Sequence, residues 1–157
     1  MSNVLIGIIG VILFIGLALA GALFLGPQFQ ESTNNSRAAA SVQAVSQVAS
    51  AANMYEVQEG LAVDAVATLK SSQYLKSIPG NPTGGEGVPT LVDTDGEATT
   101  FESVDMVLGK NAGKVCDAIA KQTGTLATDT NAAPTARPAG PAGCFTAAGV
   151  STAFARI

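Results

Sequence analysis

The chain has 157 residues, of which 47% are hydrophobic and only 13% charged, and its formal net charge at pH 7 is -4. This acidic balance argues against binding to a nucleic-acid backbone as the main task of the protein. Histidine is absent, which removes the commonest general base and a frequent metal ligand. We therefore expect no enzyme, no cofactor and no metal site.

The N-terminal segment is the most apolar part of the chain. The first charged side chain is Glu31, and Val4–Leu25 consists almost entirely of apolar residues and glycine. An α-helix rises 1.5 Å per residue, so about 20 residues cross a hydrocarbon core of about 30 Å. The segment is therefore long enough to span a membrane, or to lie in an equally dry interior made by protein.

A removed signal peptide is a weaker interpretation of this segment. The apolar run exceeds the roughly 7–15 residues of a typical signal-peptide core, and no basic residue precedes Arg37. We expect instead that a short charged leader has been cut away and that Met1 is the first mature residue. The positive-inside rule then leaves the orientation of the helix undetermined, because no loop precedes it.

The helical pattern continues beyond Pro27, which we expect to kink the helix rather than end it. Small and apolar residues then recur at spacings of three and four, which predicts one face of an amphipathic helix. These residues are Ala38, Val42, Val45, Ala49, Ala52 and Tyr55. We predict one long helix from about Ser2 to about Glu59, ended by Gly60.

The segment that follows the helix has the signals of a loop and two strands. Leu61–Gly87 is predicted to be a connecting loop that contains a short helix at Val63–Ser71. Val88–Asp93 and Ala98–Val104 are rich in residues that favour strands. Between them lies Asp95-Gly96, a dipeptide typical of tight hairpin turns, so the two runs are predicted to pair.

The last third of the chain is predicted to add a helix, a loop and further strands. Asn111–Lys121 reads as a short helix with Asn111 as its N-cap. Thr125–Gly143 is a low-complexity stretch of Thr, Ala, Pro and Gly, typical of a surface loop. Cys144–Arg156 is predicted to form a strand or hairpin that closes the sheet. The expected fold class is α+β, with a long N-terminal helix packed on a small antiparallel sheet.

The sequence divides into three regions on this interpretation. Residues 1–27 form an apolar transmembrane or filament-core helix, residues 28–59 an amphipathic continuation, and residues 60–157 a globular head. The head contains both cysteines, Cys116 and Cys144. If the head crosses a membrane it enters an oxidising space, which favours a disulfide between them. Two independent buried thiols are the alternative.

In this order, the features resemble a type IV pilin, and more closely the type IVb branch. The resemblance rests on the apolar helix with Pro27 near its end, on the loop Leu69–Pro82 with its Tyr-Leu and Pro-Gly-Asn-Pro steps, and on the C-terminal region. There, a hydrophobic strand at Phe101–Val107 leads to a helix with a cysteine, a late second cysteine and a terminal strand. The resemblance covers most of the chain, and each feature alone is weak.

The resemblance implies a structural subunit that polymerises into an extracellular pilus-like filament. The subunit would lie in the inner membrane before assembly, and residues 1 to about 55 of many copies would then stack into a hydrophobic core at the cell surface. A prepilin peptidase, a platform protein and an ATPase are implied as partners. The residues expected to pack in the filament core are Leu5, Ile6, Ile9, Leu13, Phe14, Leu17, Phe24 and Pro27.

The chain departs from the family at the fifth mature position, which is usually glutamate. Leu5 stands there, and no alternative cleavage site supplies an acid before Glu31. Two interpretations remain: a pilin that assembles by apolar packing alone, or a minor or tip subunit such as a pseudopilin of a secretion or DNA-uptake system. A single-pass anchored domain that binds a partner without polymerising is an alternative of another class.

Three further sequence features have ordinary explanations that we favour. The acidic residues near the predicted hairpin offer oxygen ligands of the kind calcium prefers, but they alternate, and a solvated rim is favoured; they are Asp93, Asp95, Glu97, Glu102 and Asp105. Asn34-Asn35-Ser36 matches a glycosylation triplet but lies in a predicted helix. The loop Thr123–Thr135 is interpreted as a variable exposed cover. Arg137 and Arg156 are candidates for contacts between subunits.

Overall fold

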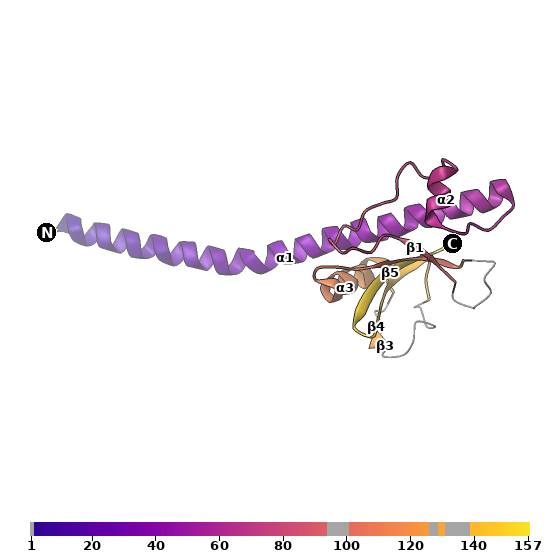
Figure 1. Ribbon diagram of the computed structural model, residues 1–157. Coiled ribbons are helices and arrows are strands. Elements are labelled where there is room, and N and C mark those ends of the chain that lie inside the picture. The colour runs from indigo at the N-terminus through magenta and orange to yellow at the C-terminus, as the bar shows by residue number, and fades with distance from the viewer. Residues whose placement is uncertain (1, 94–100, 126–128, 131–138) are drawn as a thin grey trace. The chain divides into compact units, whose positions relative to one another are not determined.

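The computed structural model describes residues 2–93, 101–125, 129–130 and 139–157 (Figure 1). The chain divides into two compact units, Met1–Thr33 and Asn34–Ile157. Helix α1 (Ser2–Glu59) supplies all of the described residues of the first unit and the opening segment of the second.

The single long helix predicted from the sequence is confirmed. Pro27 lies inside α1 and does not end it. The helix ends before Gly60, whose φ of 69° is the left-handed conformation that commonly closes a helix. The predicted amphipathic stripe is also confirmed in the second unit: Ala38, Val45, Ala49 and Ala52 are buried, and Val42 and Tyr55 are partly buried against the same core.

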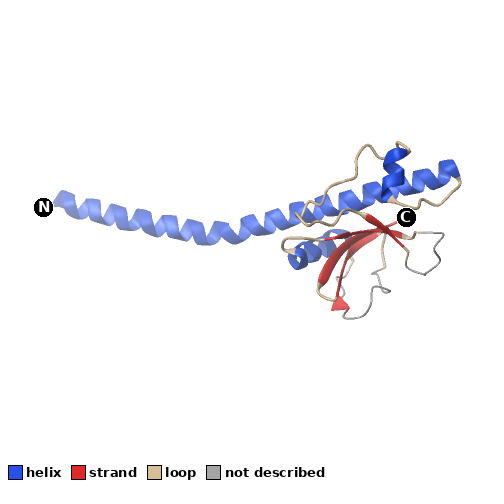
Figure 2. Ribbon diagram, viewed as in Figure 1, coloured by secondary structure: helices blue, strands red, loops and turns tan. Residues whose placement is uncertain are grey.

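Among the described residues, five strands form one sheet in the order β1-β2-β5-β4-β3. Figure 2 shows strands in red beside the helices in blue. All neighbours pair antiparallel except β3, which is parallel to β4. The strands are β1 (Thr90–Val92), β2 (Ser103–Val107), β3 (Asp129–Thr130), β4 (Ala142–Ala147) and β5 (Val150–Arg156). The fold class is therefore α+β, as expected.

The predicted pairing of the first hairpin is confirmed, but the bounds of its second strand differ from the prediction. Strand β1 pairs with β2 in the register Thr90↔Asp105 and Leu91↔Val104. Strand β2 begins at Ser103, which pairs with both β1 and β5, and the described residues 101–102 before it are not in a strand. Ala98–Thr100 of the predicted run lie outside the described residues. The predicted turn at Asp95-Gly96 lies outside the described residues.

Two other boundaries differ from prediction. Helix α2 (Val66–Ser71) begins three residues later than expected, because Ala65 before it is extended, with φ −156° and ψ 151°. Asp129–Thr130, inside the predicted surface loop, pairs with β4 and adds a short edge strand. The predicted C-terminal hairpin is confirmed by the antiparallel pairing of β4 with β5.

Helix α3 (Ala112–Thr123) confirms the predicted helix, and Asn111 is its N-cap residue, as predicted, although without a side-chain cap. Asn111 has a left-handed backbone, with φ 57°, and its side chain makes no capping hydrogen bond. Its backbone carbonyl instead accepts a hydrogen bond from Val115 N at 2.9 Å. Asparagine adopts this conformation more readily than most residues, so the residue suits the position for its backbone and not for its side chain.

The hydrophobic core of the second unit lies on one face of the sheet. Val104, Met106, Ala153 and Ala155 alternate along β2 and β5 and are buried in one cluster with residues of α1, α2 and α3. Because successive side chains of a strand point to opposite faces, the residues between them face the other side. The sheet therefore has a core face and an outer face.

Candidate functional site

The apolar residues of the first unit are exposed. Every large apolar side chain from Val4 to Leu25 has more than half of its surface accessible, with Phe14 at 73% and Phe24 at 77%. This set includes seven of the predicted packing residues, Leu5, Ile6, Ile9, Leu13, Phe14, Leu17 and Phe24, and Pro27 is exposed as well. The structure therefore places these residues on a helix surface that no part of the described chain covers.

Such a surface is not stable in contact with water. Removing apolar area from water contributes roughly 25 cal/mol per Å², and soluble monomers rarely expose large contiguous apolar patches. Within the described residues, α1 is one helix that is long and apolar enough to cross a membrane, judged by length and composition. Its first half requires lipid or other protein around it.

The predicted disulfide is confirmed. Cys116 of α3 and Cys144 of β4 are bonded, with an S–S distance of 2.03 Å and a Cα–Cα distance of 5.4 Å. Both residues are buried in the core. The bond therefore fixes α3 against the sheet.

The connecting loop is held to the end of β2 by the side chain of Asn81. Its Nδ2 donates hydrogen bonds to Gly87 O at 3.0 Å and Val107 O at 2.7 Å. Its Oδ1 accepts from the backbone N of Thr83 at 3.0 Å and from Thr83 Oγ1 at 2.6 Å. The sequence predicted a turn at this point and gave no sign of this bridge.

The same region contains a close backbone contact. Thr83 Oγ1 accepts a hydrogen bond from Gly109 N at 2.6 Å. A Cβ atom added at Gly109 would lie 2.6 Å from Gly85 Cα, which is closer than real Cβ contacts allow. Only glycine fits at position 109, so this contact together with the Asn81 bridge fixes the loop in place.

A tyrosine attaches the far end of the loop to the end of α1. The rings of Tyr55 and Tyr74 meet edge to face with centroids 5.4 Å apart. The Tyr74 hydroxyl donates a shared hydrogen bond to Gln58 Oε1 at 2.9 Å and Glu59 Oε1 at 3.0 Å. Partial burial, followed by the hydrogen bond to the Glu59 carboxylate and its charge, raises the pKa of Tyr74 above its usual value of 10.0.

A groove of about 520 Å³ lies on the face of the sheet that points away from the core. Phe145 forms part of it, and its ring is 6.0 Å from that of Phe154, on the same face of the sheet. The groove is lined by Glu86, Gly87, Val88, Thr90, Val92, Asp105, Val107, Phe145, Ala147, Val150 and Thr152. No pattern in the sequence indicated this groove.

The acidic residues near the first hairpin do not form a metal site in the described part of the chain. Asp105 is buried, and its Oδ1 accepts a hydrogen bond from Ser103 Oγ at 3.2 Å. No three His, Cys, Asp or Glu side chains gather so as to hold a metal ion among the described residues. Asp95 and Glu97 lie outside those residues.

The structure also places several of the remaining sequence candidates. Asn34 lies within α1 and is buried, which favours the ordinary explanation of the glycosylation triplet. Arg156 is exposed at the end of β5. Arg137 and most of Thr123–Thr135 fall outside the described residues.

Comparison of the chain with protein-family models, with curated proteins and with solved structures finds no match.

Proposed function

We propose that this chain is a structural subunit that polymerises through its apolar N-terminal helix into an extracellular filament of the type IV pilus kind. The observation that carries the proposal is the exposed apolar surface of Val4–Leu25 on a helix whose later residues belong to a compact, disulfide-bonded head. Packing such helices from many copies removes their apolar surface from water at roughly 25 cal/mol per Å². The filament core is then a bundle of these helices.

The glycines of the apolar helix support packing between helices. A Cβ atom added at Gly7, Gly10, Gly16, Gly21 or Gly26 would meet nothing within 4 Å in the single chain. Each glycine costs an isolated helix about 1 kcal/mol relative to alanine. A plain anchor has no use for five of them, whereas small residues let neighbouring helices approach closely.

The head has the properties of a domain that works outside the cytoplasm. Disulfides persist in oxidising spaces and are rare in the cytosol, and the bond between Cys116 and Cys144 joins a helix to the central part of the fold. In the proposed filament the heads form the outer surface, and no catalytic step is assigned to them.

Two other functions are favoured by specific observations. A minor or tip subunit is favoured by the lack of any carboxylate before Glu31, because the acid usual in the family can be missing from such subunits. A single-pass anchored domain is favoured by the length and composition of α1 alone. In the anchored alternative, the head binds a partner and the helix stays in lipid.

Electron microscopy of material sheared from native cells, with peptide mass mapping, distinguishes these functions. We expect thin regular filaments composed mainly of this chain. Filaments with only traces of it would indicate a minor or tip subunit. Recovery only in the membrane fraction, as a small particle after detergent extraction, would contradict polymerisation and support the anchored domain.

A further inference from the structure

The groove on the outer face of the sheet has an apolar floor and an acidic wall. Val88, Val107 and Val150 line it and are 51%, 46% and 46% exposed, respectively. Glu86 stands at its wall and is exposed. Asp105 contributes a second carboxylate, which is buried and held by Ser103 Oγ. A cationic side chain with a long apolar stem matches this combination.

Lysine is such a side chain, because its apolar stem can lie along an apolar surface while its ammonium group reaches a charge. Two exposed lysines, Lys70 and Lys76, lie at the end of α2 and in the loop that follows. Neither makes an ion pair with any described residue, and Glu86 makes none within that part of the chain either. Among the described residues, the charges of Lys70, Lys76 and Glu86 are therefore available for a contact with another molecule.

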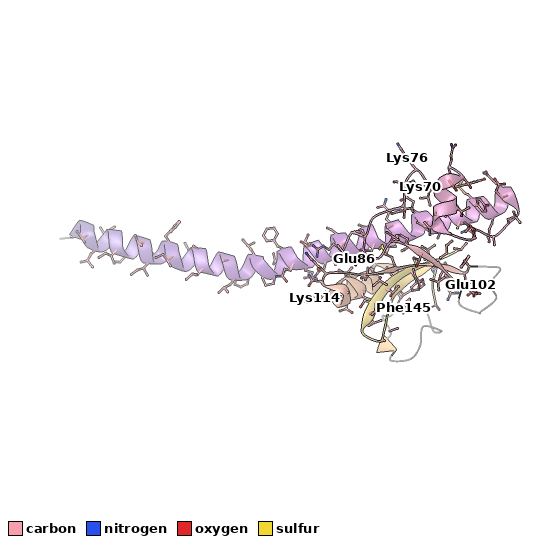
Figure 3. All side chains as sticks on the ribbon, viewed as in Figure 1. Lys70, Lys76, Glu86, Glu102, Lys114 and Phe145 are labelled. Carbon is pink, nitrogen blue, oxygen red and sulfur yellow. A yellow bond between two sulfur atoms is a disulfide. The ribbon has the colours of Figure 1, made fainter. Side chains whose placement is uncertain are left out.

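These surfaces lie on opposite sides of the second unit. Val66 and Leu69 of α2 pack into the core from one side, and the sheet covers the core from the other with its groove face turned outward. Figure 3 shows Lys70 and Lys76 beyond the α1 segment on the α2 side, and Phe145 on the sheet side. Within one copy, the core and the sheet therefore lie between the two lysines and Phe145.

We propose that the groove receives the Lys70–Lys76 segment of a second copy of this chain, with Glu86 as the main partner of its ammonium groups. This inference rests on the proposed function and deepens it by naming a contact between heads. A contact that joins two different surfaces of identical subunits is heterologous, and repeating it generates a ring or an open helical polymer. The contact therefore propagates along a filament in a way that a symmetric dimer contact does not.

The first test is cross-linking of the full chain, in sheared filaments or in detergent. A carbodiimide joins a lysine amine to a carboxylate in contact with it, with loss of one water molecule and no spacer. Peptide mapping is expected to find Glu86 joined to Lys70 or Lys76. Lys114 and Glu102 are exposed and outside both surfaces and serve as internal controls that should not join these partners.

The second test is charge reversal in the full chain. Glu86→Lys should weaken the association of one head with the next about fivefold, the upper range for an exposed ion pair, and so lower the fraction of chain that assembles. The double change Lys70→Glu with Lys76→Glu should do the same, and the triple variant should recover most of the assembly. Glu102→Lys and Lys114→Glu are matched controls that should assemble normally.

The outcomes separate this inference from the proposed function. Filaments that form equally from all variants, without the expected cross-link, would overturn the contact and leave polymerisation intact. A chain that forms no filament but gives a small oligomer joined through Glu86 and Lys70 or Lys76 would support the contact and contradict the filament. A chain that stays monomeric by light scattering, without cross-links, would overturn both.

Discussion

Large apolar side chains are buried in one unit of this chain and exposed in the other. In Asn34–Ile157, large apolar side chains such as Leu69, Met106 and Ile119 are fully buried in one core. In Met1–Thr33, residues of the same kind, such as Leu13, are mostly exposed. The second unit thus buries most of its large apolar side chains internally, whereas the apolar helix needs lipid or other protein around it. Substitutions in one unit should therefore leave the properties of the other unchanged.

The largest expected effect comes from a charge in the apolar helix. Leu13→Lys should reduce the fraction of chain in filaments or membranes at least tenfold, because a lysine amid hydrocarbon costs about 3 kcal/mol per copy. Thermal unfolding of the head, followed in detergent by near-ultraviolet circular dichroism, should not change. The control Val57→Lys adds the same charge at a position of α1 that is 86% exposed and lies beyond the segment expected to pack, and it should assemble. Normal assembly of Leu13→Lys would contradict the role of the helix.

Removal of the disulfide should have the opposite pattern of effects, destabilising the head and leaving the apolar helix unchanged. Replacing Cys116 and Cys144 together by alanine should destabilise the head by about 3.5 kcal/mol, the chain-entropy value for a loop of this length. Urea denaturation with and without reductant measures the loss, and reduced wild-type chain should match the variant. Partition of the apolar helix into membranes should stay the same. A loss below about 1 kcal/mol would show that the core alone holds α3 against the sheet.

Substitution of two glycines of the head by alanine compares a position where an added Cβ atom collides with backbone and a position where it meets nothing. Gly109→Ala should cost about 1–3 kcal/mol, because its Cβ would collide with the Gly85 backbone. Gly113→Ala in α3 meets nothing within 4 Å and should stabilise the head by about 0.5–1 kcal/mol through helix propensity. Urea midpoints of the two variants give the comparison. Equal midpoints would mean that the loop shifts freely and is not fixed against the end of β2.

The smallest expected effect is a pH dependence at Tyr74. Its pKa is raised in the folded chain, so its stabilising contribution is complete below the unfolded pKa of about 10 and is lost as pH rises through the higher folded pKa. The urea midpoint of wild-type chain should therefore fall more steeply above pH 10 than that of Tyr74→Phe. Tyr55→Phe keeps the Tyr74 hydroxyl and should retain the steep fall. If the urea midpoints of wild type and Tyr74→Phe fell in parallel with rising pH, the ionisation of Tyr74 would not be coupled to stability.

Features that depend on local sequence could be predicted. The extent of α1 follows from an apolar run, a stripe at spacings of three and four, and Gly60 at its end. Only two cysteines are present, so the sequence leaves open only whether they pair or stay free, and the disulfide is the favoured outcome. Asn111 is the N-cap of α3, as predicted, but it suits that position through its left-handed backbone and not through a side-chain hydrogen bond.

Features that depend on distant segments could not be predicted. Strand β2 pairs with β5 from Ser103 to Val107, and no pattern within residues 98–107 indicates that register. Asn81 lies in a predicted turn, but its bond to Val107 O joins positions 26 residues apart. The groove combines alternate residues of four strands with Glu86 and Val88 from the loop before β1. The exposed apolar helix, in contrast, could be inferred from composition alone.

The strand order has a consequence for how the head is made. Strand β5 lies between β2 and β4, so β2 ends at Val107 but gains its second neighbour only after Val150–Arg156 has been synthesised. Until then, Val104 and Met106 border an open edge, the kind of edge that attracts other strands. Long-range pairing of this kind is also slow to form. A growing chain therefore passes through a stage in which β2 lacks its central neighbour and is exposed to pairing with the wrong strand.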